Sequence, residues 1–187
     1  WLSAAGTSCF LSALAAALLL GLSPARFAGI VGSVLKQLAF PLLTIASVLA
    51  VAFVMNYAGM TSTLGLAFAA TGSLFPFFSA MLGWTGVFLT GSDTASNALF
   101  GNLQVVTANA LGLNPILTAS TNAATGVMGK MISLQSIAVA VAATGMATSE
   151  EGRLFRITLK HSLILALFMA VVTMIFAYVV PQLVPSA

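Results

Sequence analysis

Long apolar runs constrain the possible fold of this chain more than any other feature. Leu2–Gly21, Leu38–Tyr57 and Leu163–Val180 are each about 20 residues long and contain no charged side chain. An α-helix of that length crosses the hydrocarbon core of a bilayer. Charged residues make up only 5% of the chain, against about 25% in soluble domains, so they cannot cover a water-exposed surface. The sequence therefore predicts an all-α, polytopic integral membrane protein.

Charge and cysteine usage argue against several other functions. The net charge of +3 is too small to indicate a nucleic-acid partner. The single Cys9 excludes an intramolecular disulfide and a metal site built from cysteines. No phosphate-binding loop, metal-ligand spacing or hydrolase triad stands out. The sequence thus predicts neither an enzyme nor a cofactor or metal site.

The segments between the long runs are interrupted by glycine, proline and polar residues. We expect residues 22–36 to form a connector and residues 59–72 a short arm near the membrane surface. Residues 74–111 form two short apolar arms around a polar tip, which is typical of a re-entrant helical hairpin. Residues 116–146 can cross the membrane, but the polar residues in their middle indicate a broken helix. Residues 1–187 are thus expected to be one transmembrane transport domain fragment with spans at 2–21, 38–57, 116–146 and 163–180.

Basic residues predict the orientation of these segments. Arg26 and Lys36 lie in one connector, and three further basic residues lie within 153–160 in another. The positive-inside rule places both connectors in the cytoplasm, which requires an even number of crossings between them. The second span and the broken helix supply two crossings, so the hairpin would enter and leave on the outer side. Counting 59–80 and 81–111 as full spans gives four crossings and also satisfies the rule.

The start of the chain and the start of the last helix carry weaker signals. The chain begins at Trp1 with no basic residue before its first apolar run, which does not resemble a signal peptide. We therefore expect it to be a piece of a longer polypeptide. Thr148 and Glu151 have capping-box spacing, which predicts that the last helix begins there.

Two polar clusters interrupt the apolar sequence. The first, Thr90–Asn97, contains one carboxylate, four hydroxyls and an amide, and the second is Thr118–Gly126. Lipid cannot hydrate such groups, so they must face protein, water or a solute. A helix beginning near Asn97 and a half-helix after Gly126 would each direct free N–H groups toward one cluster, and glycine allows close backbone approach. This pattern predicts a binding site for a small carboxylate near the bilayer midplane.

Asp93 and Lys130 are the charged residues of this predicted site. An isolated ionised carboxylate is costly in hydrocarbon and would repel an anionic solute, so we expect Asp93 to gain a proton together with the solute. It could instead hold Na⁺, pair with a cation or cap a helix. Lys130 would neutralise the substrate carboxylate or pair with Asp93, and a purely structural role is the alternative.

The hydroxyl and amide side chains of both clusters are the predicted donors to the substrate. Any single hydroxyl can instead bond the carbonyl four residues earlier in its helix. Asn97 and Gln104 are seven residues apart and share one face of the second arm of the hairpin. The candidate substrate-binding residues are Ser92, Thr94, Ser96, Asn97, Ser120, Thr121, Asn122, Thr125 and Lys130, with Asp93 as the proton-coupling residue.

Two strings of sequence resemble one known family. Residues 88–104 read FLTGSDTASNALFGNLQ and residues 119–133 read ASTNAATGVMGKMIS. Both strings resemble the L-lactate permease family, and the likeness covers most of the chain. It implies a proton-coupled symporter of L-lactate, glycolate and related 2-hydroxymonocarboxylates in a bacterial inner membrane. Members are longer, so the chain would be their C-terminal part, and the N-terminal half of the same transporter would complete the site.

The resemblance also implies an inverted-repeat fold. The family is similar to a wider group of ion transporters in which each half has one re-entrant hairpin and one interrupted helix. Their Ser-Asn-Thr-like tips bind carboxylates and coupling ions, whereas Ser92-Asp93-Thr94 has an acid in place of the amide, which fits proton coupling. The alternatives are a sodium-coupled carrier of another organic anion and a non-transporting membrane subunit that packs against partners. Assembly into a homo-oligomer is left open.

Overall fold

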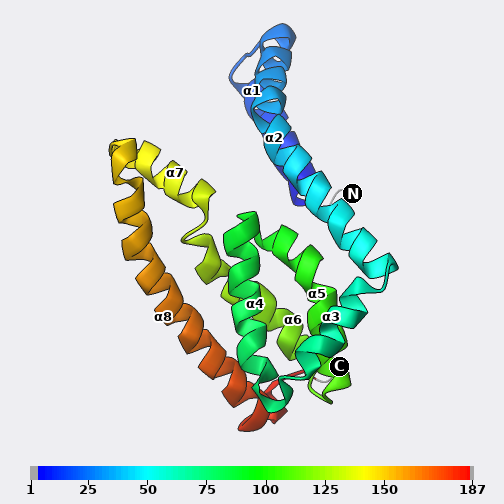
Figure 1. Cartoon of the computed structure of the whole chain (residues 1–187). Coiled ribbons are helices and arrows are strands. Elements are labelled where there is room, and N and C mark those ends of the chain that lie inside the picture. Colours follow the sequence, from blue (N-terminus) through cyan, green and yellow to red (C-terminus); the bar gives the residue numbers. More distant parts are fainter. Residues whose placement is uncertain (1–3, 186–187) are drawn as a thin grey trace. The chain divides into compact units, whose positions relative to one another are not determined.

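The chain is helical throughout its described part. The computed structural model describes residues 4–185, apart from the side chains of Pro41, Ala142 and Thr148. These residues form eight α-helices, three short 3₁₀ helices and no strand (Figure 1). This confirms the all-α prediction.

Two compact units divide the chain, Trp1–Thr44 and Ile45–Ala187, and each is described by itself. The first unit contains α1 (Ala5–Leu19) and the first part of α2 (Pro24–Tyr57). The helix α1 has 15 residues, fewer than the span predicted over 2–21, of which residues 2 and 3 lie outside the described part.

The helix α2 corrects one expectation, because the predicted connector over 22–36 is helical. Ser23 accepts a hydrogen bond from the Arg26 backbone N–H at 3.4 Å, and Pro24 occupies the first helical position, where its missing N–H costs little. Arg and Lys are good helix formers, so the presence of Arg26 and Lys36 does not interrupt the helix. A bend separates its segments Pro24–Phe40 and Leu42–Tyr57.

The second unit contains the remaining helices. In chain order they are α3 (Met60–Ala69), η1 (Gly72–Leu74), α4 (Phe75–Thr90), α5 (Asp93–Ala110), α6 (Pro115–Lys130), α7 (Leu134–Thr144), η2 (Thr148–Glu150), α8 (Glu151–Tyr178) and η3 (Pro181–Leu183).

The helices α4 and α5 form a helical hairpin where the sequence predicts one. Gly91 ends α4 in the left-handed conformation with φ 67°, and Ser92 caps α5 by accepting from the Ala95 N–H at 3.3 Å. The second arm therefore begins at Asp93, four residues before the start expected near Asn97. The arms have 16 and 18 residues, and the second is longer than expected because it begins earlier. With η1 the first arm is long and apolar enough to cross a membrane.

The helix predicted over 116–146 is interrupted, but later than expected. The break between α6 and α7 lies after Lys130, and Ser133 caps α7 by accepting from the Ser136 N–H at 3.3 Å. The expected half-helix start after Gly126 is therefore wrong. Gly126 lies inside α6, and so does the whole second polar cluster.

The last helix begins at Glu151, after the 3₁₀ turn Thr148–Glu150, and Glu150 is its N-cap. The Thr148 side chain, predicted to cap this helix, lies outside the described residues. The helix runs without interruption to Tyr178, through the basic residues that were expected to precede the last span.

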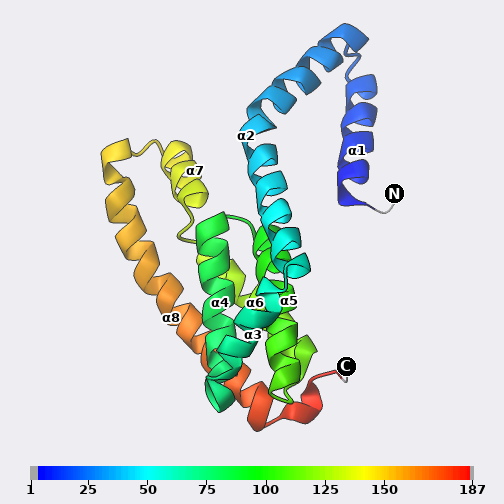
Figure 2. The same ribbon diagram turned by 45° about the vertical axis from the view of Figure 1, so that its right-hand side comes forward.

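Backbone contact between α4 and α6 lies at the centre of the second unit. Figures 1 and 2 show α4 among α5, α6 and α8, and all three helices pack against it. A methyl group added at Gly83 would overlap the Asn122 carbonyl oxygen, and one added at Gly129 would overlap the Trp84 carbonyl oxygen. Glycine at these positions therefore lets two helix backbones touch, as small residues do in membrane proteins.

Three segments of the described chain are long and apolar enough to cross a membrane. They are Gly72–Thr90, Pro115–Val141 and Glu151–Tyr178, and the bent α2 makes a fourth if it counts as one span. This confirms a polytopic membrane protein.

Candidate functional site

Hydrogen bonds within the chain hold the tip of the hairpin. The Thr90 hydroxyl lies 2.8 Å from the Gly86 carbonyl oxygen and 3.0 Å from the Ser92 carbonyl oxygen. The Lys130 ammonium, at the end of α6, donates to the Gly91 carbonyl oxygen. A cation thus sits at the C-terminal end of α4, where the helix dipole is negative.

A chain of side-chain amides joins the two polar clusters. Gln104 Nε2 donates to Asn122 Oδ1 at 3.2 Å, and Asn122 Nδ2 donates to Asn97 Oδ1 at 2.7 Å. Asn97 Nδ2 donates in turn to Asp93 Oδ2 at 3.0 Å. We call these four residues the amide chain. The structure therefore brings together Asp93, Asn97 and Asn122, one carboxylate and two amides from the predicted site.

Backbone carbonyls anchor the far end of the amide chain. Gln104 Nε2 also donates to the Ser79 carbonyl oxygen of α4 at 3.0 Å. The Thr118 hydroxyl donates to the Gln104 carbonyl oxygen at 3.3 Å, and the Ser79 hydroxyl donates to the Thr118 carbonyl oxygen at 3.4 Å. Gln104 and Asn122 have no solvent exposure within the chain. The Gln104 end of the amide chain is thus buried where α4, α5 and α6 meet, whereas Asn97 and Asp93 are half-buried.

Three buried side-chain oxygens of the site have no hydrogen-bond partner in the described part of the chain. They are Asp93 Oδ1, the hydroxyl of Ser96 and Oε1 of Gln104. A methyl group built on Gly126 would lie 2.5 Å from Asp93 Oδ1, so this oxygen points at the α6 backbone. Buried polar atoms are usually paired, so an unpaired carboxylate oxygen indicates a site with a further role.

Several predicted binding residues lie away from the amide chain. Thr94 and Ser120 are exposed on α5 and α6. The Thr125 hydroxyl bonds the Thr121 carbonyl oxygen at 2.6 Å, and the Thr121 hydroxyl lies 3.3 Å from that of Thr173 in α8. The Thr125 hydroxyl is thus used within α6, and the Thr121 hydroxyl joins α6 to α8. The Ser92 hydroxyl is used as a helix cap, as described above.

Sequence reasoning assigned Gln104 no role in the site, although it noted that Gln104 shares a face with Asn97. Their spacing of seven residues was the available signal, since it places two amides two helical turns apart. The spacing does not show the Ser79 carbonyl, which belongs to another helix.

The electrostatics of this region involve few groups. Within α3, α4, α5 and α6 the titratable side chains are Asp93 and Lys130. The ammonium of Lys130 bonds the tip carbonyl and not the carboxylate of Asp93. No group of three or more His, Cys, Asp or Glu side chains that could hold a metal ion occurs among the described residues.

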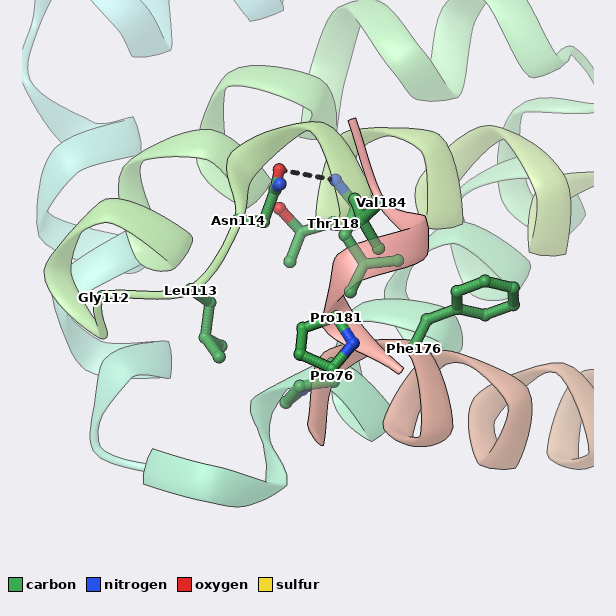
Figure 3. A pocket seen from close by; sticks show the side chains of 10 residues that line it. Pro76, Gly112, Leu113, Asn114, Thr118, Phe176, Pro181 and Val184 are labelled. Atoms are coloured by element: carbon green, nitrogen blue, oxygen red, sulfur yellow. Dashed lines mark hydrogen bonds between the residues drawn. The ribbon is translucent and has the colours of Figure 1, made fainter. Parts of the chain in front are cut away.

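A cavity of about 250 Å³ lies at the opposite end of the hairpin from its tip. Figure 3 shows its lining at the start of α4, the loop before α6 and the end of α8, including Pro76, Asn114 and Phe176. The Asn114 side-chain oxygen accepts from the backbone N–H groups of Ile116 and Leu117, at 2.8 and 3.3 Å. The side-chain nitrogen of Asn114 donates to the Pro185 carbonyl oxygen at 2.8 Å, so both ends of this amide are used within the chain and the cavity offers a weaker carboxylate site than the tip.

Comparison with known proteins gives the family. The family model described as L-lactate permease matches residues 1–180. This chain belongs to the L-lactate permease family. As predicted, its relatives are permeases and not enzymes, and with the apolar helices this makes it a multi-pass membrane protein.

Individual relatives are similar over almost the whole chain. The glycolate permease GlcA of Escherichia coli K12 is 52% identical over 178 residues, which are 95% of this chain and 32% of that protein. The L-lactate permease of Salmonella typhimurium is 50% identical over 185 residues, 99% of this chain and 33% of that protein. The L-lactate permease of Bacillus subtilis is 47% identical over 184 residues, 98% of this chain and 32% of that protein. The chain thus spans about a third of the length of these relatives, and no solved structure matches it.

Proposed function

We propose that the polypeptide carrying this chain is a proton-coupled symporter of L-lactate, glycolate and related 2-hydroxymonocarboxylates in a bacterial inner membrane. The observation that supports this most is the amide chain, which runs from the buried Gln104 to the half-buried Asp93. The relatives named L-lactate permease and glycolate permease support the substrate class.

Asp93 is proposed to carry the coupling proton. An ionised Asp93 would repel a carboxylate solute, and protonation removes that repulsion, so proton and solute would bind together. Asp93 accepts from the neutral Asn97 amide, while the nearby cation, Lys130, bonds the Gly91 carbonyl. Asp93 can therefore gain or lose a proton without breaking an ion pair to Lys130.

The substrate carboxylate is proposed to bind beside the hairpin tip. An ammonium has three N–H groups, and the Gly91 carbonyl takes one from Lys130, which leaves two for a carboxylate. The buried Ser96 hydroxyl lies in the first turn of α5 on the same tip. Thr94 and Ser120 are exposed and available to the solute or to other parts of the polypeptide. The other candidate residues, which form hydrogen bonds within the chain, would hold the site in shape without contacting the solute.

The hairpin α4–α5 is proposed to be re-entrant. The arm α5 carries Asp93 and several amides, which lipid would not hydrate, so it must be covered by protein or water. The N-terminal half of the same transporter would supply this cover together with an inverted copy of the hairpin. The described chain would then contribute about half of the binding site.

Uptake by proteoliposomes that contain the whole polypeptide tests the proposal. A pH gradient should drive accumulation of labelled L-lactate. The Asp93→Asn variant should lose this accumulation but keep exchange of internal for external L-lactate, because its neutral amide no longer needs a proton. Accumulation by the variant at the parent rate would refute the proton role. Replacing Na⁺ with choline at fixed pH should leave uptake unchanged, and a loss of uptake would instead support sodium coupling.

A further inference from the structure

We infer that Gln104 is a positioning residue that sets the direction of the amide chain and confines the coupling proton to Oδ1 of Asp93. The inference rests on the proposed function, because it concerns how Asp93 would hold that proton. It assigns a specific task to a residue that would not touch the substrate.

The Ser79 backbone carbonyl fixes the orientation of the Gln104 amide. A carbonyl oxygen only accepts, so Gln104 must present its NH₂ group to it, at 3.0 Å. The same nitrogen lies 3.2 Å from Asn122 Oδ1, so Asn122 must also act as the acceptor at that contact. Gln104 is fully buried in the chain, so bulk water cannot replace either bond.

This orientation passes from one amide to the next. Because the Asn122 oxygen faces Gln104, its Nδ2 faces Asn97 Oδ1 at 2.7 Å. The Asn97 nitrogen therefore faces Asp93 Oδ2 at 3.0 Å. Flipping any one amide would place two N–H groups or two oxygens against each other, which loses both bonds that the amide makes. Oδ2 thus receives a donor in either protonation state of Asp93.

Oδ1 is consequently the oxygen on which the O–H bond can form. It is buried, has no partner in the described residues and points at the α6 backbone beside Gly126. The proton would come from water on one side of the membrane, form the O–H bond at Oδ1 and leave to water on the other side. Of the helices that contact α5 within the second unit, α3 and α4 have no titratable side chain and α6 has Lys130, which bonds the Gly91 carbonyl. The helix α2 contacts α5 at Asn56 and has Tyr57 as its titratable side chain in this unit.

The near-isosteric variant Gln104→Glu tests the inference. A Glu oxygen at this place would accept from Asn122, while its hydroxyl could still donate to the Ser79 carbonyl. The amide chain would then reverse, and Asn97 would present its oxygen to Asp93 Oδ2, which favours a protonated Oδ2. We expect the pH of half-maximal L-lactate uptake to rise by about one unit, comparable to one charge-assisted hydrogen bond. Gln104→Met removes both bonds of the Gln104 amide and leaves the amide chain free to reorient. It should raise the pH of half-maximal L-lactate uptake by about half a unit.

Asn102→Leu is the matched control. Asn102 lies on the same helix, but its amide donates to Asn56 Oδ1 at 2.9 Å, outside the amide chain. The control should keep the pH profile of the parent protein.

Three outcomes would overturn the inference: an unchanged pH profile in both Gln104 variants, an equal shift in the control, or loss of both Gln104 variants from the membrane. If Asp93→Asn abolishes accumulation while the Gln104 variants leave the profile unchanged, only the inference fails. If Asp93→Asn accumulates L-lactate normally, the proposed function fails as well.

Discussion

At the scale of single residues, glycines determine whether Asp93 can occupy its position. A methyl group on Gly126 would lie 2.5 Å from Asp93 Oδ1 and 2.6 Å from a Val87 methyl carbon. Val87 is fully buried and cannot move aside, whereas Asp93 is half-buried, so an added methyl group would displace the carboxylate. The carboxylate and α6 therefore fit together only because residue 126 has no side chain.

Gly126→Ala should consequently impair coupling more than folding. The added methyl group would displace the Asp93 carboxylate, and small displacements of a reacting group often cost about tenfold to a hundredfold in rate. We expect such a loss in gradient-driven uptake by proteoliposomes. Gly101→Ala is the control, because nothing lies within 4 Å of a methyl group there. Equal uptake rates in the two variants would contradict this role of Gly126.

The sequence identifies three of the four residues of the amide chain as site candidates but does not predict their bonds. Asp93, Asn97 and Asn122 are identifiable because polar residues stand out in apolar sequence. The Gln104 contact depends on the backbone carbonyl of Ser79, which has no sequence signature. For the same reason the contact of Thr121 with Thr173 was not predicted, since it requires knowing which hydroxyls face α8. The Thr125 bond to the carbonyl four residues earlier is the alternative that the sequence allows for any helical hydroxyl.

At the scale of helices, α4 and α6 are held by contacts that tolerate no added atom. The Trp84 carbonyl lies where a Gly129 side chain would be, and Trp84 Nε1 donates to the Ser162 hydroxyl of α8 at 2.8 Å. The Ser162 hydroxyl also donates to the Met128 carbonyl oxygen of α6. Three helices thus meet around this part of α4.

Gly129→Ala should therefore destabilise the protein. The added methyl group meets backbone atoms that cannot rotate away, and overpacking of this kind typically costs about 1–3 kcal/mol. We expect a lower midpoint in thermal unfolding of the whole polypeptide in detergent. Gly152→Ala, at a position with nothing within 4 Å, should leave the midpoint unchanged. A midpoint for Gly129→Ala equal to that of the control would show that α4 and α6 can separate at little cost.

Helix boundaries were predicted less well than the helices themselves. The hairpin was expected, but its second arm was expected to begin near Asn97, whereas the left-handed Gly91 and the Ser92 cap place the start at Asp93. The break expected at Gly126 was misplaced, because a glycine inside a helix serves close packing as often as it ends the helix. The connector predicted over 22–36 was wrong because basic residues indicate that a segment contacts water, and not that a helix ends there.

At the scale of the whole molecule, the basic residues lie away from the loop that joins α5 to α6. Arg153, Arg156 and Lys160 follow α7, whereas residues 111–114 carry no charge. If the segment Pro115–Val141 crosses the membrane, these two regions lie on opposite sides, with the basic one in the cytoplasm.

Labelling of single cysteines tests this orientation. In a Cys9→Ala background, Ala110→Cys and Ser149→Cys place thiols at exposed positions on either side of that segment. A membrane-impermeant maleimide added to whole cells should label Ala110→Cys, whereas Ser149→Cys should react only after the membrane is opened. Labelling of both cysteines from outside would exclude a single crossing between them.

The contact of the α4 and α6 backbones also limits how the protein can move. Two helices that meet without intervening side chains cannot slide along each other unless they first separate. If the carrier alternates between two states, α4 and α6 would travel as a single rigid piece. Any bending would then occur in the three-residue junction Met131–Ser133 between α6 and α7, where the regular helical hydrogen bonds are already interrupted.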